Sequence, residues 1–103
     1  MIALSYEAMG DLADRVVLAC WAHPSGWAWY VVEYHPDEEH PGAPARLAWG
    51  LVKGHYLEFG YFDLDELRSV GATPVPGWQA ITIGDVLKRM QEQALEEARR
   101  DAR

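Results

Sequence analysis

The chain has 103 residues, half of them apolar and 24% charged, which is the size and composition of one globular domain with one core. Sixteen Asp and Glu outnumber nine Lys and Arg, so the net charge is −7. This charge has the wrong sign for neutralising phosphates, and we predict no direct binding of nucleic acid. We expect a single domain over residues 1–103, with a sheet-bearing part at 15–83 and a C-terminal helix at 84–101.

Cysteine content and hydropathy predict a cytoplasmic protein. Cys20 is the single cysteine, so no intramolecular disulfide is possible and no oxidising compartment is implied. Glu7, Asp11 and Asp14 interrupt the apolar residues near the N-terminus, which argues against a signal peptide. The longest uncharged stretch, 16–32, has a Pro-Ser-Gly turn at its centre, so it indicates a hairpin and no membrane contact.

The first third of the chain predicts a short helix and a hairpin. Apolar residues at roughly helical spacing favour a short helix over Ser5–Asp14. β-Branched and aromatic residues then fill 16–22 and 27–32 on either side of a turn, which indicates two antiparallel strands. Because both faces of these strands are apolar, we expect packing on each side of the sheet.

A proline-rich segment separates this hairpin from a second one. His35–Arg46 contains three prolines and the acidic run Asp37-Glu38-Glu39, a composition typical of an exposed loop. The aromatic and β-branched pattern returns at 47–53 and 56–62, around a tight turn at Gly54-His55. Four antiparallel strands are therefore expected in this part of the chain.

Two helices follow the hairpins. Asp63 is placed to cap a short helix that ends by Gly71, and Thr82 is placed to cap the C-terminal helix, after a short strand at 78–81. The apolar stripe of the C-terminal helix consists of Val86, Leu87, Met90, Ala94, Leu95 and Ala98. This stripe either covers the sheet or pairs with a second copy, and covering is favoured because the sheet needs a lid.

These elements predict an α+β fold. We expect a twisted, mainly antiparallel sheet of four to five strands with short helices, and a long C-terminal helix packed on one face.

Three blocks of the sequence form an ordered set: WxWYxxE at 27–33, GLVxG at 50–54 and ExGYFxLxEL at 58–67. They resemble a family of small proteins of bacterial plasmids, integrative elements and phages, whose function is not established. The resemblance covers 16–75 and ends before 77–79, where the family usually has an Arg-Asp pair. It implies an α+β fold and a mobile-element context, in which small acidic proteins often counter restriction or CRISPR systems.

Glu33 and Glu58 are acids that end or interrupt apolar strands. Antiparallel pairing would bring them to one edge of the sheet, where a close pair splits its pKa values and suits acid and base catalysis. The favoured interpretation is that each acid is satisfied by an Arg, a Lys or backbone N–H groups near the rim. The runner-up is a small hydrolase or metal-dependent enzyme that uses both acids, with His55 nearby in sequence.

Cys20, His23, His35 and His40 offer one thiolate and three imidazoles, the ligand types of a tetrahedral zinc site. However, residues 20 and 23 of a continued strand point to opposite faces, and the two later histidines lie in a loop rich in carboxylates. We favour a core cysteine with three surface histidines, and predict no metal and no cofactor.

Asp37, Glu38, Glu39 and Trp78 are the candidate partner-binding residues. Residues 1–83 hold eleven acids and four bases, whereas 84–103 hold five of each, so the acidic surface belongs to the sheet-bearing part. Clustered carboxylates attract a basic protein surface, although a solvated loop is the simpler interpretation. Trp78 follows a Pro-Gly pair in a loop, and is either an exposed anchor or folded back over the sheet.

The sequence thus favours a non-enzymatic, acidic interaction protein of a mobile element, which binds and inhibits a basic host protein such as a defence nuclease. One alternative is the enzyme based on Glu33 and Glu58. Another is a structural or assembly factor that dimerises through its C-terminal helix, and we expect a monomer or a homodimer.

Overall fold

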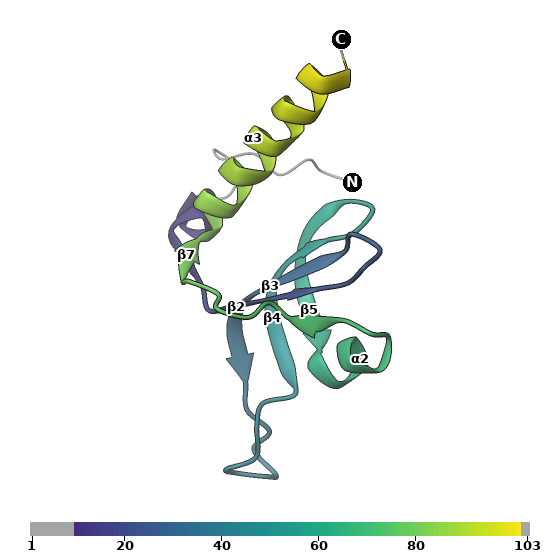
Figure 1. Cartoon of the computed structure of the whole chain (residues 1–103). Helices are drawn as coiled ribbons and strands as arrows, with labels where there is room; N and C mark the ends of the chain where they lie inside the picture. Colours follow the sequence, from purple (N-terminus) through teal and green to yellow (C-terminus); the bar gives the residue numbers. More distant parts are fainter. Residues whose placement is uncertain (1–9, 102–103) are drawn as a thin grey trace.

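An antiparallel sheet of five strands forms the centre of the molecule, whose computed structural model describes residues 10–101 (Figure 1). In spatial order the strands are β5 (Leu57–Asp63), β4 (Leu47–Lys53), β3 (Ala28–His35), β2 (Ala19–Ala22) and β6 (Thr73–Pro74). β3 and β4 carry the β-branched and aromatic residues that favour extended backbone. Both predicted hairpins are present, since β2 pairs with β3 and β4 pairs with β5. The α+β fold is therefore confirmed.

The remaining elements lie around this sheet. They are the 3₁₀ helix η1 (Gly10–Asp14), β1 (Val16–Val17), α2 (Leu64–Ser69), β7 (Ile81–Thr82) and α3 (Ile83–Asp101). β1 pairs with β7 in a separate two-stranded sheet, so the predicted strand over 16–22 is divided between two sheets. The helix predicted over Ser5–Asp14 is present as η1 from residue 10 onward, and its earlier residues lie outside the described part of the chain.

β6 occupies one edge of the sheet, in a segment where the two prolines suggest only a loop. It pairs with β2 at Trp21 and Ala22. Pro74 has no N–H to donate to a neighbouring strand, which argues against a strand in the sequence. At an edge this donor is not needed, so the proline is tolerated. The predicted strand at 78–81 is wrong in extent, because β7 begins only at Ile81.

Two glycines in β4 and its following turn allow close approach. A Cβ at Gly50 would lie 1.8 Å from the carbonyl oxygen of Tyr30, so no side chain fits there unless β3 moves. This contact lies beside an irregularity in the register between β3 and β4. A Cβ at Gly54 would lie 2.5 Å from the Trp27 ring, which fills the space that a side chain would take.

Both faces of the sheet are covered, as the apolar pattern of its strands predicts. Trp29 and Val31 of β3 point to one side, and Tyr30 and Val32 to the other. The first side is the α2 face, against which α2 packs; its core contains Trp21, Trp29, Val31, Ala48, Phe62, Leu64, Leu67 and Ala72. The second side is the α3 face, covered by η1, β1 and the start of α3; its core contains Ala13, Val17, Val32, Leu51, Ile83 and Val86.

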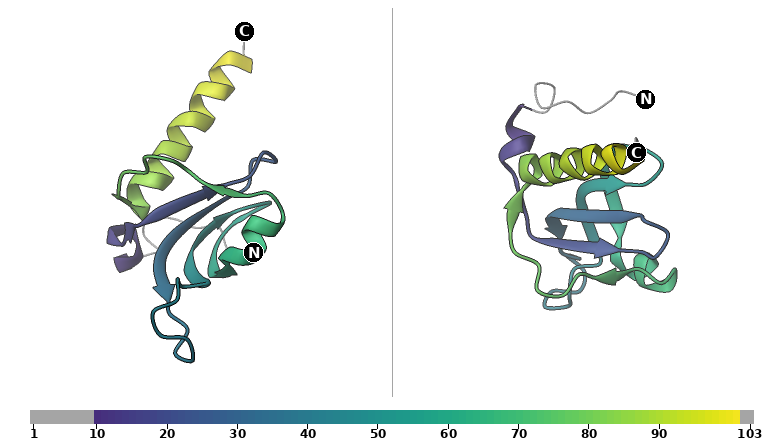
Figure 2. Two further views of the ribbon diagram at one scale, coloured as in Figure 1. Left: turned by 60° about the horizontal axis from the view of Figure 1, so that its bottom comes forward. Right: turned by 45° about the horizontal axis from the view of Figure 1, so that its top comes forward.

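The long helix α3 contacts the body of the molecule through its first half. A capping box begins it: the Asp85 N–H donates to Thr82 Oγ1 at 3.1 Å, and the Thr82 N–H donates to the Asp85 carboxylate at 3.3 Å. Every residue from 91 to 101 is exposed, and this outer half projects away from the sheet (Figures 1 and 2). The helix on one face is confirmed, but Ala94, Leu95 and Ala98 of its apolar stripe remain exposed.

Candidate functional site

The segment between β3 and β4 forms a loop that projects from one end of the sheet (Figure 1). Residues 36–44 are all exposed, which confirms the loop predicted from its prolines and acids. Two turns order its backbone: the His40 N–H donates to the Asp37 carbonyl at 3.2 Å, and the Ala43 N–H donates to the His40 carbonyl at 3.1 Å. We name residues 36–46 the acidic loop.

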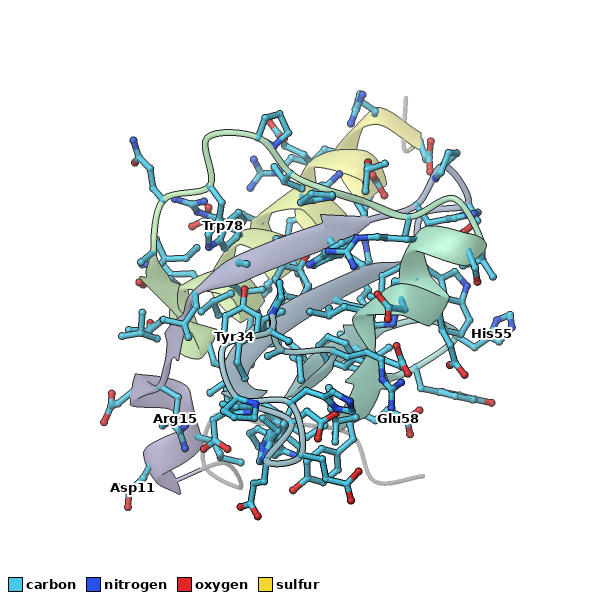
Figure 3. All side chains as sticks on the ribbon, turned by 90° about the horizontal axis from the view of Figure 1, so that it is seen from below. Asp11, Arg15, Tyr34, His55, Glu58 and Trp78 are labelled. Carbon is cyan, nitrogen blue, oxygen red and sulfur yellow. The ribbon has the colours of Figure 1, made fainter. Side chains whose placement is uncertain are left out.

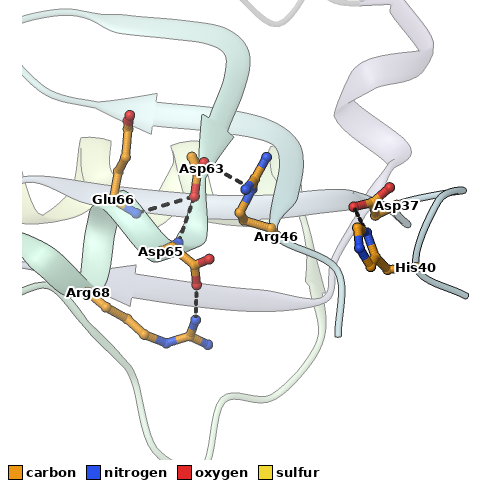
Figure 4. Close-up of polar contacts among 7 residues, drawn as sticks. All are labelled: Asp37, His40, Arg46, Asp63, Asp65, Glu66 and Arg68. Carbon is orange, nitrogen blue, oxygen red and sulfur yellow. Dashed lines mark hydrogen bonds and ion pairs between the residues drawn. The ribbon is translucent and has the colours of Figure 1, made fainter. Parts of the chain in front are cut away.

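The Asp37 carboxylate orders the acidic loop through contacts with two residues of the same loop. One carboxylate oxygen accepts a hydrogen bond from the Glu39 N–H at 2.9 Å. The other lies 2.9 Å from His40 Nδ1, a contact that Figure 4 shows. The His40 contact, and after it the Glu39 N–H, hold the pKa of Asp37 below its usual value. Glu38 and Glu39 make no ion pair within residues 10–101. Their carboxylates are therefore available on an ordered turn.

One group of three potential metal ligands occurs in the described part of the chain, and it lies in the acidic loop. Ligand atoms of Asp37, Glu39 and His40 lie within 4.8 Å of one another, and all three residues are exposed. Asp37 is already engaged by His40, and exposed acids commonly gather without an ion. The group does not by itself indicate a cation site.

The four residues considered as zinc ligands are dispersed. Cys20 is buried in β2 on the α3 face, and desolvation raises the pKa of its thiol to about 11. His23 lies on the α2 face, where its Nε2 is 2.9 Å from the Val70 carbonyl oxygen. His35 ends β3, and His40 lies in the acidic loop. This arrangement matches the favoured interpretation of a core cysteine and separate histidines.

Glu33 is engaged by its neighbours on the α3 face. Arg15 Nη2 donates a hydrogen bond to Glu33 Oε1, and this bond lowers the pKa of the Glu33 carboxyl. Glu33 Oε2 lies 3.3 Å from His35 Nε2, a buried nitrogen without a well-formed hydrogen bond to any residue of 10–101. The His35 ring packs edge-on to Tyr61, with centroids 5.2 Å apart. Glu33 is therefore an acid satisfied mainly by an arginine.

Glu58 does not meet Glu33. Glu58 pairs in register with Val52, which packs against the α2-face core, whereas Glu33 pairs with Trp49, which packs on the α3 face. The two acids therefore belong to opposite faces of the sheet. In Figure 3, Glu58 and Arg15, the partner of Glu33, lie on opposite sides of the molecule. The meeting of the two acids at one edge, which an acid and base pair requires, is not found.

Trp78 is folded back onto the sheet (Figure 3). Its indole Nε1–H donates to the Val17 carbonyl at 3.0 Å, and its ring centroid lies 6.1 Å from that of Tyr30. The side chain is half-buried against the α3-face core. Because β1 and the middle of β3 hold this ring, it does not lie with the acidic loop, which starts beyond the end of β3. Of the two alternatives for Trp78, the structure has the ring folded back, and its part in binding a partner stays a prediction.

The acids around the start of α2 have structural roles. The Asp63 carboxylate accepts hydrogen bonds from the Asp65 N–H at 2.8 Å and the Glu66 N–H at 3.3 Å, which confirms the predicted helix cap (Figure 4). Asp63 also lies 3.3 Å from Arg46, and Asp65 lies 2.9 Å from Arg68. These acids are occupied by capping and ion pairing.

Arg15 is the site residue that the sequence did not identify. It lies 18 positions from Glu33, on the other side of a hairpin, so no local pattern connects the two residues. The only signal is the scarcity of bases in residues 1–83, which makes each base a candidate partner for a strand acid. His55, considered as a neighbour of the acid pair, instead packs edge-on to Trp27 with centroids 5.4 Å apart.

Comparisons with protein-family models, with curated proteins and with solved structures found no match to this chain. The family resemblance of the three motif blocks therefore stays a prediction. Within residues 10–101, no helix combines the length and the apolar character needed to cross a membrane.

Proposed function

We propose that this chain is a non-enzymatic binding protein whose acidic loop docks on a basic surface of another protein. The observation that carries the proposal is that Glu38 and Glu39, which make no ion pair within residues 10–101, lie on a projecting loop that Asp37 orders through internal contacts. The resemblance to mobile-element proteins adds the class of target: a basic host protein, such as a defence nuclease, that the bound chain inhibits.

Charge and order both support binding through this loop. The whole net charge of −7 arises from residues 1–83, so the field around the sheet-bearing part attracts a cationic partner. Clustered carboxylates can occupy the positions that phosphates take on a nucleic-acid-binding surface. The internal hydrogen bonds of the acidic loop reduce the conformational entropy that is lost when it binds.

The enzyme alternative receives less support from the geometry. Acid and base catalysis by two carboxylates requires both groups beside one substrate. Glu33 is bonded to Arg15, and Glu58 belongs to the other face of the sheet. A single acid engaged by arginine is a poor general acid, because the arginine stabilises its ionised form.

The test compares three versions of the tagged chain as baits for host proteins at moderate salt. The first is unchanged, the second carries Glu38→Lys with Glu39→Lys, and the third carries Glu92→Lys with Glu96→Lys. The third is a matched control, because it changes the net charge equally on the exposed outer half of α3. Asp37 is kept so that the loop stays ordered.

We expect a basic protein to be captured by the unchanged chain and the control, and to be lost from the loop variant and at high salt. The purified partner should likewise bind the unchanged chain and the control more tightly than it binds the loop variant. Capture that is equal with all three baits, or absent with all of them, would show that the acidic loop is not the binding site.

A second candidate function, self-assembly through α3, is favoured by one observation. The outer half of α3 is exposed along its whole length, and Leu95 keeps 53% of its surface accessible. Light scattering across a range of concentrations tests this alternative. A dimer that Leu95→Lys converts to a monomer would support it, and a monomer at high concentration would remove it.

A further inference from the structure

A cavity of about 140 Å³ lies between α3 and the α3 face of the sheet. Its apolar walls include Tyr30 of β3, Trp78, Ile81 of β7 and Met90 of α3. Trp78 is held in one orientation by its hydrogen bond to the Val17 carbonyl. A cavity of roughly 150 Å³ with apolar walls accepts a molecule of the size of benzene. The space therefore suits one ring or a short alkyl chain.

Two cations reach this cavity from different elements. Lys53 stands at the end of β4 and Arg89 on α3, while Gln93 adds a side-chain amide one turn further along the helix. Neither cation makes an ion pair with any residue of the described chain, 10–101. The other bases of residues 1–83 all pair with carboxylates; they are Arg15, Arg46 and Arg68. Lys53 is thus an exception in a strongly acidic part of the chain.

Glu97 limits where an anion can sit. A second hollow of about 210 Å³ continues along α3 and shares Lys53, Met90 and Gln93 with the first cavity. Glu97 lines this second hollow and not the first, whereas Arg89 lines only the first. A negative charge is therefore favoured beside Arg89 and disfavoured further out along the helix.

From these features we infer that the cavity binds a small organic anion. Lys53 and Arg89 hold its carboxylate, and its aromatic or short aliphatic body contacts Tyr30 and Trp78. A guanidinium group presents two parallel N–H donors that match the two oxygens of a carboxylate. Burial of the apolar body supplies the remaining affinity. This site is separate from the acidic loop, so the failure of either proposal would leave the other unaffected.

Phenylacetate is the probe, and 2-phenylacetamide is its neutral match of the same shape. Binding is followed on the NMR signal of the Trp78 indole N–H, assigned with Trp78→Phe. We expect phenylacetate to shift this signal with a Kd of about 1 mM or below. The amide should bind at least about tenfold more weakly, because it cannot form a charge-assisted contact with either cation.

Variants of exposed side chains then locate the anion. Lys53→Gln combined with Arg89→Gln should weaken phenylacetate binding by about tenfold or more. Lys88→Gln, the matched control on the same helix, should leave it unchanged, because Lys88 does not line the cavity. Glu97→Gln should bind the probe equally or more tightly.

Three results would each overturn the inference. They are an unchanged Trp78 signal at up to about 20 mM phenylacetate, equal affinity for the acid and the amide, and equal affinity of the double variant and the unchanged chain. Because Lys53, Lys88, Arg89 and Glu97 are exposed, far-UV circular dichroism should show that their variants remain folded.

Discussion

The two faces of the central sheet are covered to different extents. On the α2 face, Leu64 and Leu67 of a short helix close over Trp29 and Phe62, and all four side chains are buried. On the α3 face, Val17 and Leu51 are fully buried, but burial along α3 itself ends after Val86. Beyond that point α3 diverges from the sheet. A cavity, partly covered aromatic rings and the exposed outer half of the helix therefore lie on this side.

This difference distinguishes the residues that stabilise the fold from those that are accessible to other molecules. The stacked rings of Trp49 and Phe59 lie on the α3 face with centroids 5.2 Å apart, and both residues are only partly buried. Tyr61, next along the edge strand, keeps 63% of its surface accessible. We expect the buried core residues of both faces to determine the free energy of unfolding, and the partly covered rings and the outer half of α3 to tolerate substitution and to contact ligands.

Gly50→Ala should have the largest effect, because both faces depend on one register between β3 and β4. The new Cβ would meet the Tyr30 carbonyl oxygen, a backbone atom that cannot move without shifting β3. We expect a loss of about 3 kcal/mol or more in the free energy of unfolding, measured in urea.

Gly60→Ala is the matched control, because Gly60 pairs with Gly50 in register and no atom of the described residues, 10–101, lies within 4 Å of its added Cβ. It should change the free energy of unfolding by no more than about 0.5 kcal/mol. Equal losses for the two variants would mean that the close approach of β3 to β4 is not what makes glycine necessary.

Leu67→Ala and Leu95→Ala compare the closed face with the free helix directly. Leu67 is buried under α2, so its truncation should cost about 2 to 4 kcal/mol of unfolding free energy. Leu95 is exposed on the outer half of α3, and its truncation should cost less than about 0.5 kcal/mol. A large loss at Leu95 would mean that the outer half of α3 is covered in solution, as in a dimer.

Thr82→Ala tests how firmly the start of α3 is fixed. The hydroxyl of Thr82 accepts the Asp85 N–H, so its removal leaves a helix-end donor without a partner. We expect a loss of about 1 kcal/mol in unfolding free energy. Thr82→Ser retains the hydroxyl and should lose less, whereas equal losses would assign the effect to the methyl group of threonine.

Glu33→Gln should have the smallest effect, and the effect should depend on pH. Arg15 lowers the pKa of Glu33 in the folded state, so the stabilisation by this ion pair is present at neutral pH. As pH falls below about 4.3, the ordinary value for Glu, and then through the folded-state pKa, the stabilisation is lost. Unfolding curves of the two proteins should therefore converge in acid; a difference that persists unchanged there would exclude the ion pair as its cause.

Much of the fold follows from local patterns in the sequence. The alternating apolar residues of β3 and β4, the turn glycines and the cap at Asp63 each act over a few residues, and each was predicted correctly. The division at Leu18 between β1 and β2 was not predictable, because apolar residues continue across it and only the partner strand changes. β6 was missed for a related reason, since its strand character comes from an edge position that no local pattern shows.

The candidate site was harder to predict than the fold. The exposure of the acidic loop follows from its prolines and charges, but the internal contact between Asp37 and His40 depends on the turn geometry. Glu33 and Glu58 belong to opposite faces because of the strand register and a bulge in β3, which side-chain alternation alone does not fix. Lys53 and Arg89 line one cavity although they come from β4 and α3, a tertiary relation without a signature in either segment.

The order of the strands also makes the two edges of the sheet unequal. One edge ends in β6, which contains Pro74 and therefore lacks one donor for a further strand. The other edge is β5, whose outer backbone groups pair with no strand within residues 10–101. Association by strand addition, including aggregation, can therefore proceed from one side. Glu58 places an exposed negative charge on that strand, which acts as a gatekeeper that keeps copies of the chain apart at neutral pH.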